Sequence, residues 1–525
     1  MKLTLPPRVS PQQFDTALKA MASVVGKDWV MSGDADRDAY ADAYSPGPQE
    51  QWPASAAVAP SSVEEVQAIV RLANEHKTPL WPVARGKNLG YGTAAPRMAG
   101  SVVLDLGRMN KIIELDPKLA YCVVEPGVGF FDLYEAIQKD KLPLWLSVPG
   151  NAWGSVLGNA LEHGIGYTPY GLHARNLCGF EVVLPQGDLI RTGMGAMDKN
   201  PAWNLFPMGY GPTWDLAFSQ SGLGVVTKAG VWLQPAPNSS LELIFDIPKA
   251  EDIGWVVDTI APLKISGLIE QNVFIPSWLG KMVLKGQRKD FWDKPGAIPE
   301  WRVQELLNEH KLGYWQVALR FYGEESVVKA KAEVVKAAMA QHLKAPPTEH
   351  WWHEGDFVDA FAITMGVPSA VPLQMSDWIG GRGAHMGFSP VVPATSEHVL
   401  GQMKRSRQII DSFDVDFYAS FTIGGRFVNN VNMLMFDRDQ PKQIATMKNL
   451  FNTLIDESAK AGYAEYRTHL GWMDRVMDTF NFNGNAIRRF NETVKDALDP
   501  NGIIAPGKQG VWPAAYRDQA KEGRA

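Results

Sequence analysis

Two glycine-rich stretches carry the residue types that could bind an anionic ligand. In the first, Gly86 to Gly92, the run Gly90-Tyr-Gly92-Thr-Ala-Ala95 formally matches the G-x-G-x-x-A pattern of nicotinamide dinucleotide sites. That pattern must open a helix whose N-terminus meets the pyrophosphate, yet Pro96 and Arg97 follow and no amphipathic period begins. The sequence therefore argues against a nicotinamide site. Glycines would let backbone amides nest around phosphate oxygens, although a plain turn is the better interpretation of this loop taken alone.

The second glycine-rich stretch makes a bound ligand the better interpretation of both. It runs from Pro149-Gly-Asn-Ala-Trp-Gly-Ser-Val-Leu-Gly-Asn159 to Gly164-Ile-Gly-Tyr-Thr-Pro-Tyr-Gly171. Two long glycine-rich loops in one domain, each bounded by strands, predict an extended anionic ligand such as a dinucleotide lying across both. Backbone donors would there take the place of basic side chains.

Composition excludes several other classes of protein. The 525 residues are 45% hydrophobic and 21% charged, a globular balance, and the net charge of -6 lacks the basic footprint of a nucleic-acid binder. Cys122 and Cys178 are too few for a disulfide framework or a multi-thiolate metal site, so we expect a reducing compartment and no metal. No apolar run has the length of a membrane span, and the N-terminus lacks the apolar core of a secretion signal. We expect a cytoplasmic protein that acts without a membrane or a nucleic acid.

Alternating strands and helices are expected to hold the two loops. A capping box at residues 61–65 predicts a helix with Val63, Val66, Ile69, Val70 and Ala73 inward. Apolar runs predict strands at residues 79–83, 101–105, 121–125, 181–184 and 225–233, with a helix near 131–138.

The pattern changes near residue 240. We expect strands at 241–247, 314–322, 417–423 and 431–436, and helices at 326–343, 398–413 and 443–461, an α+β arrangement. In the first of these helices Val327, Val334, Val335, Ala338 and Met339 are expected to face inward. The turn-rich segment 499–508 should fold back onto another surface. The predicted organisation is a first domain over 1–240 with its core at about 52–236, a second over 241–461, and a C-terminal segment over 462–525 that returns to the first.

Several long motifs resemble one known family. They are Trp81-Pro-Val-Ala-Arg-Gly-Lys-Asn-Leu-Gly-Tyr-Gly92, Ser155-Val-Leu-Gly-Asn159, Gly166-Tyr-Thr-Pro-Tyr-Gly171, Arg191-Thr-Gly-Met-Gly195, Tyr466-Arg-Thr-His-Leu470 and Asp499-Pro-Asn-Gly-Ile-Ile-Ala-Pro-Gly-Lys508. Together they resemble the vanillyl-alcohol oxidase family, which includes 4-cresol dehydrogenase and eugenol oxidase. The resemblance covers residues 50 to 515. It implies a two-subdomain FAD-binding domain of the PCMH type and an α+β cap domain over the flavin ring.

The resemblance also implies roles for individual residues. Tyr91, Tyr466 and Arg467 fall where the family surrounds the oxygen of a para-substituted phenol, and a guanidinium with two phenolic hydroxyls would favour the phenolate. His385 stands where the oxidase members attach FAD covalently. The residues expected to bind the cofactor are Arg85, Gly86, Lys87, Asn88, Leu89, Pro149, Gly150, Gly154, Ser155, Asn159, Gly166, Tyr167, Gly224, Val226, His385 and Lys508.

Two departures from the family pattern bear on chemistry. Gly150 stands where the family often places an aspartate beside flavin N5, which puts water addition and covalent attachment in question. Gly387 replaces a bulky aromatic residue and is expected to open space for larger phenols, and Asn429-Asn430 replace a histidine pair. The two cysteines are not in segments suited to a flavin bond and are expected to pack as thiols.

The resemblance implies oxidation of 4-alkylphenols, 4-hydroxybenzyl alcohols or bulkier lignin-type phenols through a p-quinone methide. We expect O2 to reoxidise the flavin and yield hydrogen peroxide, and the chain to form a homodimer or a higher homo-oligomer. The alternative is a dehydrogenase that passes electrons to a cytochrome c or a copper protein. A carbohydrate or alditol oxidase fits the Tyr/Tyr/Arg set less well, and a flavin-free binding protein is supported only by Gly150.

Overall fold

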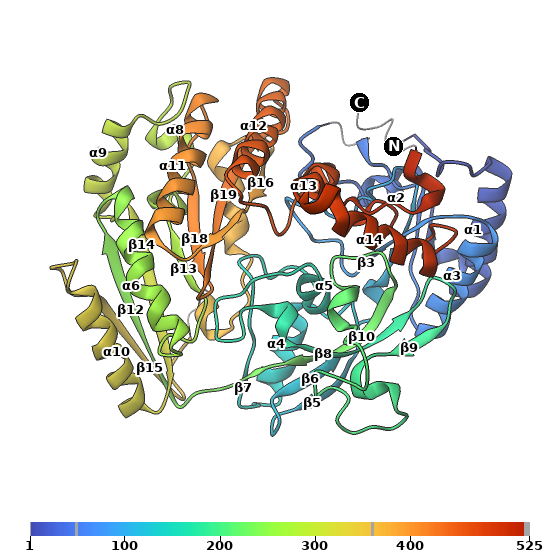
Figure 1. Cartoon of the computed structure of the whole chain (residues 1–525), viewed down its shortest axis with the longest axis horizontal. Helices are drawn as coiled ribbons and strands as arrows, with labels where there is room; N and C mark the ends of the chain where they lie inside the picture. The colour runs from blue at the N-terminus through green and yellow to red at the C-terminus, as the bar shows by residue number, and fades with distance from the viewer. Residues whose placement is uncertain (1, 48–50, 359–361, 519–525) are drawn as a thin grey trace.

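The structure is a computed structural model that describes residues 2–47, 51–358 and 362–518. Helices and largely antiparallel sheets form two bodies side by side along the long axis, an α+β architecture (Figure 1). The first body contains the N-terminal strands and helices. The second contains the green to orange elements on the left of the figure.

The N-terminal body begins with a sheet in the order β1-β2-β4-β3, in which β2 and β3 run parallel to β4 and β1 is antiparallel to β2. Its strands are β1 Val30–Met31, β2 Ala56–Val58, β3 Leu80–Val83 and β4 Val102–Asp105. The helices of this region are α1 Pro11–Val25, α2 Asp34–Ala39 and α3 Val63–Glu75.

Helix α3 begins as its sequence predicts, with one difference at the cap. The Ser62 hydroxyl accepts a hydrogen bond from the Glu65 amide at 3.3 Å. The Glu65 carboxylate, however, accepts from the amide of Ser61 at 2.6 Å rather than from Ser62. The side chains of Val66, Ile69, Val70 and Ala73 are fully buried in the core of this sheet.

A second, antiparallel sheet has the order β5-β6-β10-β8-β9. Its strands are β5 Ile112–Asp116, β6 Tyr121–Val124, β8 Leu177–Val183, β9 Leu189–Arg191 and β10 Val225–Trp232, and the short pair β7 Leu144–Trp145 and β11 Gln234–Pro235 lies beside it. Helices α4 Phe130–Lys139 and α5 Val156–Leu161 share its hydrophobic core. The first glycine-rich stretch is a loop that follows β3, and the second consists of α5 with the loops on either side of it.

The second body contains two further sheets around one hydrophobic core. One has the order β14-β12-β15 and the other β13-β18-β19-β16, with β17 also paired to β19. The strands are β12 Ser239–Ile247, β13 Val273–Pro276, β14 Trp315–Gly323, β15 Thr348–His353, β16 Gly383–Phe388, β17 Val391–Pro393, β18 Ala419–Ile423 and β19 Phe427–Asp437.

Helices cover these sheets: α6 Ile253–Ile265, α7 Trp278–Met282, α8 Arg288–Phe291, α9 Glu300–His310, α10 Glu325–Met339, α11 Ser396–Ser412 and α12 Pro441–Lys460. In α10 the inward face differs from the expectation. Val328, Ala332, Val335 and Met339 are buried, whereas Val327 and Val334 are each 48% exposed. Val335 and Met339 are inward as expected, but the expectation was wrong for Val327 and Val334, because residues at i, i+4, i+7 and i+11 share one face and these two lie beside it.

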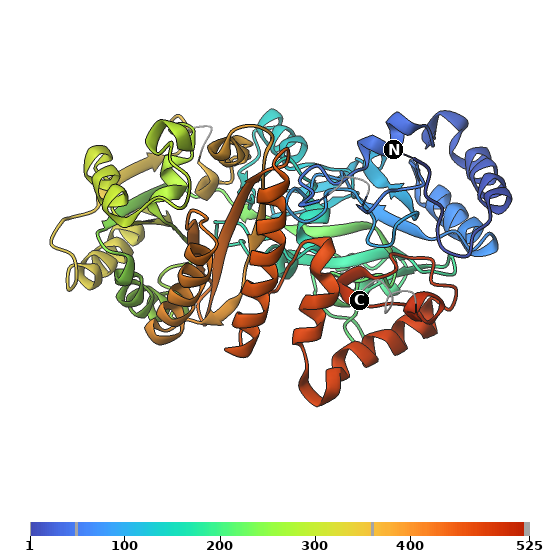
Figure 2. The ribbon, with the colours of Figure 1, turned by 90° about the horizontal axis from the view of Figure 1, so that it is seen from above.

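The C-terminal segment returns to the N-terminal body. Helices α13 Met473–Thr479 and α14 Phe482–Leu498 lie in the same half of the molecule as the blue elements in both views (Figures 1 and 2). The chain then runs along β3, where the Leu80 amide donates to the Ile503 carbonyl at 2.7 Å and the Ala505 amide donates to the Leu80 carbonyl at 2.8 Å. Arg467 and Leu470 thereby contact the first glycine-rich loop, and Lys508 lies over the Trp81 ring of β3.

Candidate active site

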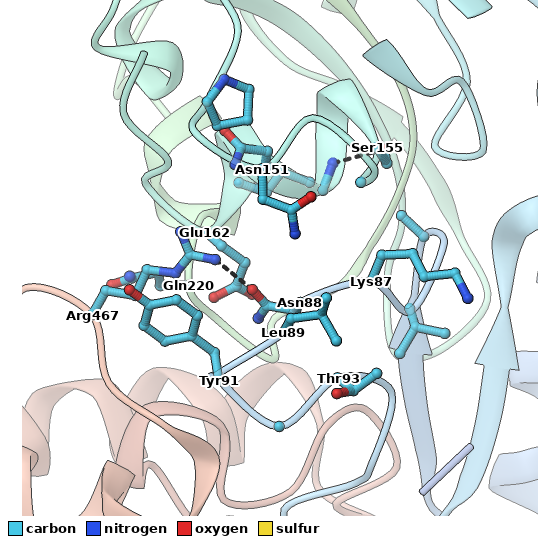
Figure 3. Close-up of a pocket in the computed structure, with 18 of the residues that line it drawn as sticks. Lys87, Asn88, Leu89, Tyr91, Thr93, Asn151, Ser155, Glu162, Gln220 and Arg467 are labelled. Carbon is cyan, nitrogen blue, oxygen red and sulfur yellow. Dashed lines mark hydrogen bonds between the residues drawn. The ribbon is translucent and has the colours of Figure 1, made fainter. Parts of the chain in front are cut away.

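One cavity of about 400 Å³ collects most of the residues expected to do chemistry. Four parts of the chain line it: the loops of the N-terminal body, one face of the β13-β18-β19-β16 sheet, the segment around Tyr466, and the short 3-10 helix Val371–Ile379. Figure 3 shows the loop residues and Arg467 around this space. The cavity therefore lies where the two bodies and the returning segment meet.

Strand alternation explains which residues of the sheet reach the cavity. Alternate residues of a strand point to the same face, and the cavity is lined by Ser420 and Thr422 of β18 and by Asn429, Val431 and Met433 of β19. His385 of β16 lies on the same face. Asn430 and Asn432 alternate to the opposite face and are fully buried.

Tyr91, Tyr466 and Arg467 all line this cavity. The guanidinium carbon of Arg467 lies 4.0 Å from the centroid of the Tyr91 ring, within the range of a cation–π contact. An Nη of Arg467 also donates to the side-chain oxygen of Asn88 (Figure 3). Its Nε is buried and has no partner in the described part of the chain.

Backbone contacts hold the Tyr91 loop against the Arg467 segment. The Leu470 amide donates to the Tyr91 carbonyl at 3.2 Å. Gly92, with φ +112°, lies so close to Leu470 that a Cβ there would be 1.9 Å from a Leu470 methyl carbon. Only glycine permits both the conformation and this approach.

A buried acid joins the same two segments from outside the cavity. Asp42 accepts a hydrogen bond from His469 Nε2 at 2.8 Å and from the Thr93 hydroxyl at 3.1 Å. His469 Nδ1 accepts a hydrogen bond from the Gly471 amide at 3.1 Å. The ring proton is therefore on Nε2, which donates the hydrogen bond to Asp42. The Asp42 contacts link the loop of Tyr91 to the segment of Arg467.

The cavity tyrosines are held in their neutral form. Burial raises the pKa of Tyr466 and of Tyr167, and the neighbouring Tyr91 hydroxyl acts in the same direction on both. Burial raises the pKa of Tyr418 to about 12. Neutral phenol hydroxyls can donate hydrogen bonds, so this group of tyrosines is suited to stabilise an anionic oxygen.

His385 lies in the wall of the cavity on β16. Its Nδ1 is 3.2 Å from the Ser376 hydroxyl, and its Nε2 faces Gly90 of the first glycine-rich loop, where a Cβ would be 3.3 Å away. The edge of the ring meets Tyr44, with ring centroids 5.1 Å apart. Burial lowers the pKa of His385 to about 4, so the imidazole is neutral near pH 7 and keeps a lone pair.

The first loop offers a run of unused backbone donors. In the described part of the chain, the amides of residues 86–90 donate no hydrogen bond, and residues 86–89 line the cavity. No helix follows the loop; turns and bends continue to residue 100. Consecutive free amides form a nest for an anion, which fits the pyrophosphate of a dinucleotide and not a plain turn.

Several expected cofactor residues line the cavity with side chains that are already engaged. Arg85 pairs with Asp132 at 2.6 Å, and the Lys508 ammonium pairs with Glu162. The Ser155 hydroxyl donates to the Pro126 carbonyl at 2.5 Å and caps α5 (Figure 3), and the Asn159 carboxamide lies 2.6 Å from His173 Nδ1. These residues can present their backbone or aliphatic parts to a ligand.

Of the residues expected from sequence, only Gly166 lies outside the lining of the cavity. A Cβ at Gly166 would be 2.4 Å from the Ser147 hydroxyl and 2.5 Å from His173 Nε2, so this glycine serves loop packing. The others in the lining are Gly86, Lys87, Asn88, Leu89, Pro149, Gly150, Gly154, Tyr167, Gly224 and Val226.

The two departures from the family pattern, Gly150 and Gly387, have different surroundings in the structure. At Gly150 a Cβ would only touch the Tyr167 hydroxyl at 3.4 Å, so the place of the acid is open space. At Gly387 a Cβ would be 3.1 Å from the Tyr91 hydroxyl and 3.6 Å from the Met433 sulfur. The space over Gly387 is thus occupied by Tyr91 and is not the extra room that the sequence led us to expect.

Sequence reasoning missed a polar group of cavity residues. Ser389, Ser420, Thr422, Thr468 and Gln220 line the cavity and were not singled out. Serine, threonine and glutamine carry no signal of their own, and contacts between distant segments bring these residues together: the pairing of β18 with β19, the bridge of Pro390 to Glu465, and the hydrogen bond from the Gln220 amide group to the Tyr466 carbonyl. Within the described ranges, no helix could cross a bilayer and no cluster of His, Cys, Asp and Glu could hold a metal ion.

Comparison with known proteins supplies the family context. Residues 54–193 match the FAD binding domain family, and residues 361–509 match the C-terminal domain of FAD linked oxidases. The chain is 34% identical to the flavoprotein subunit of 4-cresol dehydrogenase [hydroxylating] from Pseudomonas putida, over 97% of both chains. It is 28% identical to 1'-carboxy-chondrochloren decarboxylase from Chondromyces crocatus, over 97% of this chain and 100% of that protein.

Two solved structures are similar over nearly their whole length. One is 4-ethylphenol oxidase from Gulosibacter chungangensis in complex with isoeugenol, and the other is p-cresol methylhydroxylase with substrate bound. Each has a TM-score of 0.92 and 33% sequence identity, and covers 97% of this chain and 99% of its own. The expected FAD-binding domain of the PCMH type and its cap are confirmed, and the free amides of residues 86–90 fit the cofactor that this fold binds.

Proposed function

This chain belongs to the family of FAD-linked oxidoreductases that includes the 4-cresol dehydrogenase flavoprotein subunit, and from that premise we propose that it oxidises para-substituted phenols bound as phenolates. The observation that carries the proposal is the meeting of Tyr91, Tyr466 and Arg467 in one cavity beside the free loop amides. The names of the similar proteins, which concern 4-cresol, 4-ethylphenol and p-cresol, support the same substrate class.

The residues of the chain act on the phenol oxygen. Arg467 and the hydroxyls of Tyr91 and Tyr466 would favour the anionic form of this oxygen, since charge-assisted hydrogen bonds are the stronger ones. Ionisation moves electron density toward the para carbon and so weakens the benzylic C–H bond toward hydride loss. The bound FAD supplies the hydride acceptor. The phenol is thereby converted to a p-quinone methide.

Two steps follow the loss of hydride: the quinone methide reacts further, and an acceptor takes the electrons from the flavin. Water can add to the methide, or it can rearrange to an alkene, and a benzylic alcohol collapses to the aldehyde. We propose O2 as the electron acceptor, with hydrogen peroxide as its product; the similarity to an oxidase supports this choice. A cytochrome c or copper protein is the second candidate, supported by the similarity to a protein that is one subunit of a dehydrogenase.

A covalent bond between FAD and His385 is also proposed. The neutral imidazole in the cavity wall, with Nε2 toward the loop that would hold the cofactor, supports it. Two buried cysteines without a disulfide are compatible with the cytoplasm as the location, and assembly into homo-oligomers stays a prediction.

The test is turnover of a panel of 4-alkylphenols by the flavin-loaded protein. Absorbance of the product and formation of hydrogen peroxide are followed together in air, and the same panel is repeated without O2 in the presence of cytochrome c. Peroxide in step with product supports the oxidase, and cytochrome reduction alone supports the dehydrogenase. Failure to form product under either condition with every phenol contradicts the proposal.

A carbohydrate or alditol oxidase and a flavin-free binding protein are less well supported. A sugar hydroxyl would need a base, whereas the groups around Tyr91 are suited to stabilise an anion. The five free amides of residues 86–90 argue for a bound anion and against a protein that has lost its cofactor.

A further inference from the structure

The guanidinium of Arg467 is held in the cavity by uncharged groups. In the described part of the chain, the side-chain oxygen of Asn88 is its one hydrogen-bond acceptor, and no carboxylate forms an ion pair with it. Its face rests on the Tyr91 ring, 4.0 Å from the centroid. A cation in a protein interior is normally paired with an acid, so a guanidinium held by an amide and a ring keeps its charge uncompensated.

The acid of the cavity lining is engaged elsewhere. Among the described residues that line the cavity, Glu162 is the one acid, and its carboxylate pairs with the Lys508 ammonium. His163 follows it in the chain. Burial lowers the pKa of His163, and the charges of Arg467 and Lys508 act in the same direction, against that of Glu162. The imidazole is therefore neutral near pH 7.

The remaining ionisable groups of the lining supply no negative charge. They are Arg85, Lys87, His385 and four tyrosines. Arg85 pairs with Asp132 at 2.6 Å, and the Lys87 ammonium lies 4.6 Å from the centroid of the Trp153 ring. Within the described ranges, the lining thus leaves Arg467 without an ion-pair partner of its own.

Asn88 is itself fixed at both ends. Its carbonyl accepts hydrogen bonds from the amides of Tyr91 and Thr93, each at 3.1 Å, which closes the loop around it. Its carboxamide meets Arg467 (Figure 3) with Oδ1, because a guanidinium has donors and no acceptor. Nδ2 then lies on the other side of the carboxamide, and no described residue accepts a hydrogen bond from it. Asn88 and Arg467 therefore both offer donors, as an anionic ligand requires.

The uncharged state of residue 88 matters for electrostatics. A positive charge within about 4–6 Å lowers the pKa of an acid by about 1–3 units. An aspartate in place of Asn88 would hold the guanidinium by a stronger, charge-assisted bond, yet it would cancel much of the charge that a bound phenol experiences. An asparagine holds the same group and leaves the charge in place.

We propose that Asn88 is a positioning residue that holds Arg467 over Tyr91 without neutralising it, and that the cavity thereby selects the phenolate form of its substrate. The inference rests on the proposed function, since it requires a phenol bound beside Arg467. The family resemblance implied for Asn88 only a contact with the cofactor. Its side chain here acts on the substrate through Arg467.

Ionisation of a bound phenol tests this in the flavin-loaded protein. The probe is 4-fluorophenol, which has no carbon at the para position and cannot lose a hydride, and whose pKa in water is about 10. Its fluorine-19 chemical shift differs between phenol and phenolate. Nuclear magnetic resonance reads this shift without interference from the 18 Trp and 14 Tyr, which absorb in the same ultraviolet region as the probe. Titration with pH gives the pKa of the bound probe.

The wild type should bind the probe as phenolate at pH 7. Asn88→Asp should raise the pKa of the bound probe by about 1–3 units, a ten- to thousandfold loss in the preference for phenolate over phenol. Asn88→Ala frees the guanidinium but adds no charge, so its rise should be smaller. A purely structural tether predicts another order, in which Asn88→Asp resembles the wild type because it bonds Arg467 at least as well, and Asn88→Ala is the worst.

Asn151→Asp is the matched control. Asn151 lines the same cavity from the second glycine-rich stretch, and its side-chain oxygen accepts from the Trp153 amide at 3.1 Å, without a hydrogen bond to Arg467. It adds the same charge to the same cavity and should raise the pKa of the bound probe less than Asn88→Asp does. Equal rises in the two variants would mean that any added acid has this effect, and the inference would be overturned.

The flavin-to-protein absorbance ratio is measured for every variant. Loss of flavin from Asn88→Asp would show that the side chain at position 88 serves the cofactor, and would overturn the inference. If the wild type and Asn88→Asp bind phenolate with the same pKa, the inference fails and the proposed function stands. If the wild type binds the probe only as neutral phenol, both the inference and the phenolate mechanism are wrong.

Discussion

The guanidinium of Arg467 is stacked over the ring of Tyr91, with 4.0 Å between the guanidinium carbon and the ring centroid, and it donates to Asn88 at the same time. A residue near the end of the chain thus contacts two residues of one loop, 379 positions before it in the case of Asn88. Because Asn88 and Tyr91 belong to the loop with free amides, the contact fixes the position of the Arg467 charge relative to that loop.

Replacement of Arg467 by alanine should damage catalysis far more than it damages cofactor loading. A charge-assisted bond to a buried phenolate contributes about 2–4 kcal/mol, so kcat/KM should fall roughly thirty- to thousand-fold. The measurement is kcat/KM with 4-ethylphenol together with the flavin-to-protein absorbance ratio. Arg467→Lys keeps the positive charge but loses the paired donors of the planar guanidinium, so its kcat/KM should lie between those of the alanine variant and the wild type. Near-normal turnover by the alanine variant would remove Arg467 from the phenol site.

His385→Ala should release FAD from its covalent bond and leave a folded protein. The wild type should keep flavin fluorescence on a denaturing gel, whereas the variant should lose it. His398→Gln is the matched control. His398 lies on α11, outside the lining of the cavity, and its Nδ1 is 2.6 Å from the Tyr463 hydroxyl. Release of all flavin from the wild type by acid precipitation would show that no such bond exists, and the open space at Gly150 would then be the first place to look.

Gly387→Phe should lower kcat/KM for small and bulky phenols alike. The new Cβ would lie 3.1 Å from the Tyr91 hydroxyl, so the ring must displace Tyr91 from its place under Arg467. Overpacking of this kind typically costs about 1–3 kcal/mol. Parallel series with 4-cresol and with longer 4-alkylphenols measure the effect, and Gly387→Ala should give a smaller loss. A variant that loses only the bulky substrates would restore the view that Gly387 sets the size of the pocket.

Asp42→Ala should destabilise the protein by about 3–5 kcal/mol, because it leaves His469 and Thr93 without their buried partner. Chemical denaturation followed by tryptophan fluorescence gives the change in the free energy of unfolding. Asp15→Ala is the control: Asp15 pairs with Lys19 on the exposed face of α1 and should cost under about 1 kcal/mol. Equal effects of the two substitutions would mean that the Asp42 contacts do not join the two segments.

Local pattern in the sequence determined most of the elements. The cap at Ser62, the apolar runs of β3, β4 and β6, and the helix α12 follow from short-range propensities and periodicity, which act over a few residues. The glycine-rich loops were also readable, since glycine is required where backbone amides must approach a ligand. The family motifs added FAD and the residues Tyr91, Tyr466 and Arg467.

Tertiary structure alone decided how those residues act together. Val327 and Val334 of α10 are exposed because the buried face of a helix depends on the elements that pack against it. The space over Gly387 is filled by Tyr91, which belongs to the N-terminal body. Glu465 carries no motif, and its burial follows from the pairing of its segment with Pro390 beside β17. Desolvation and contacts between segments distant in the chain depend on three-dimensional packing, which no local pattern of residues specifies.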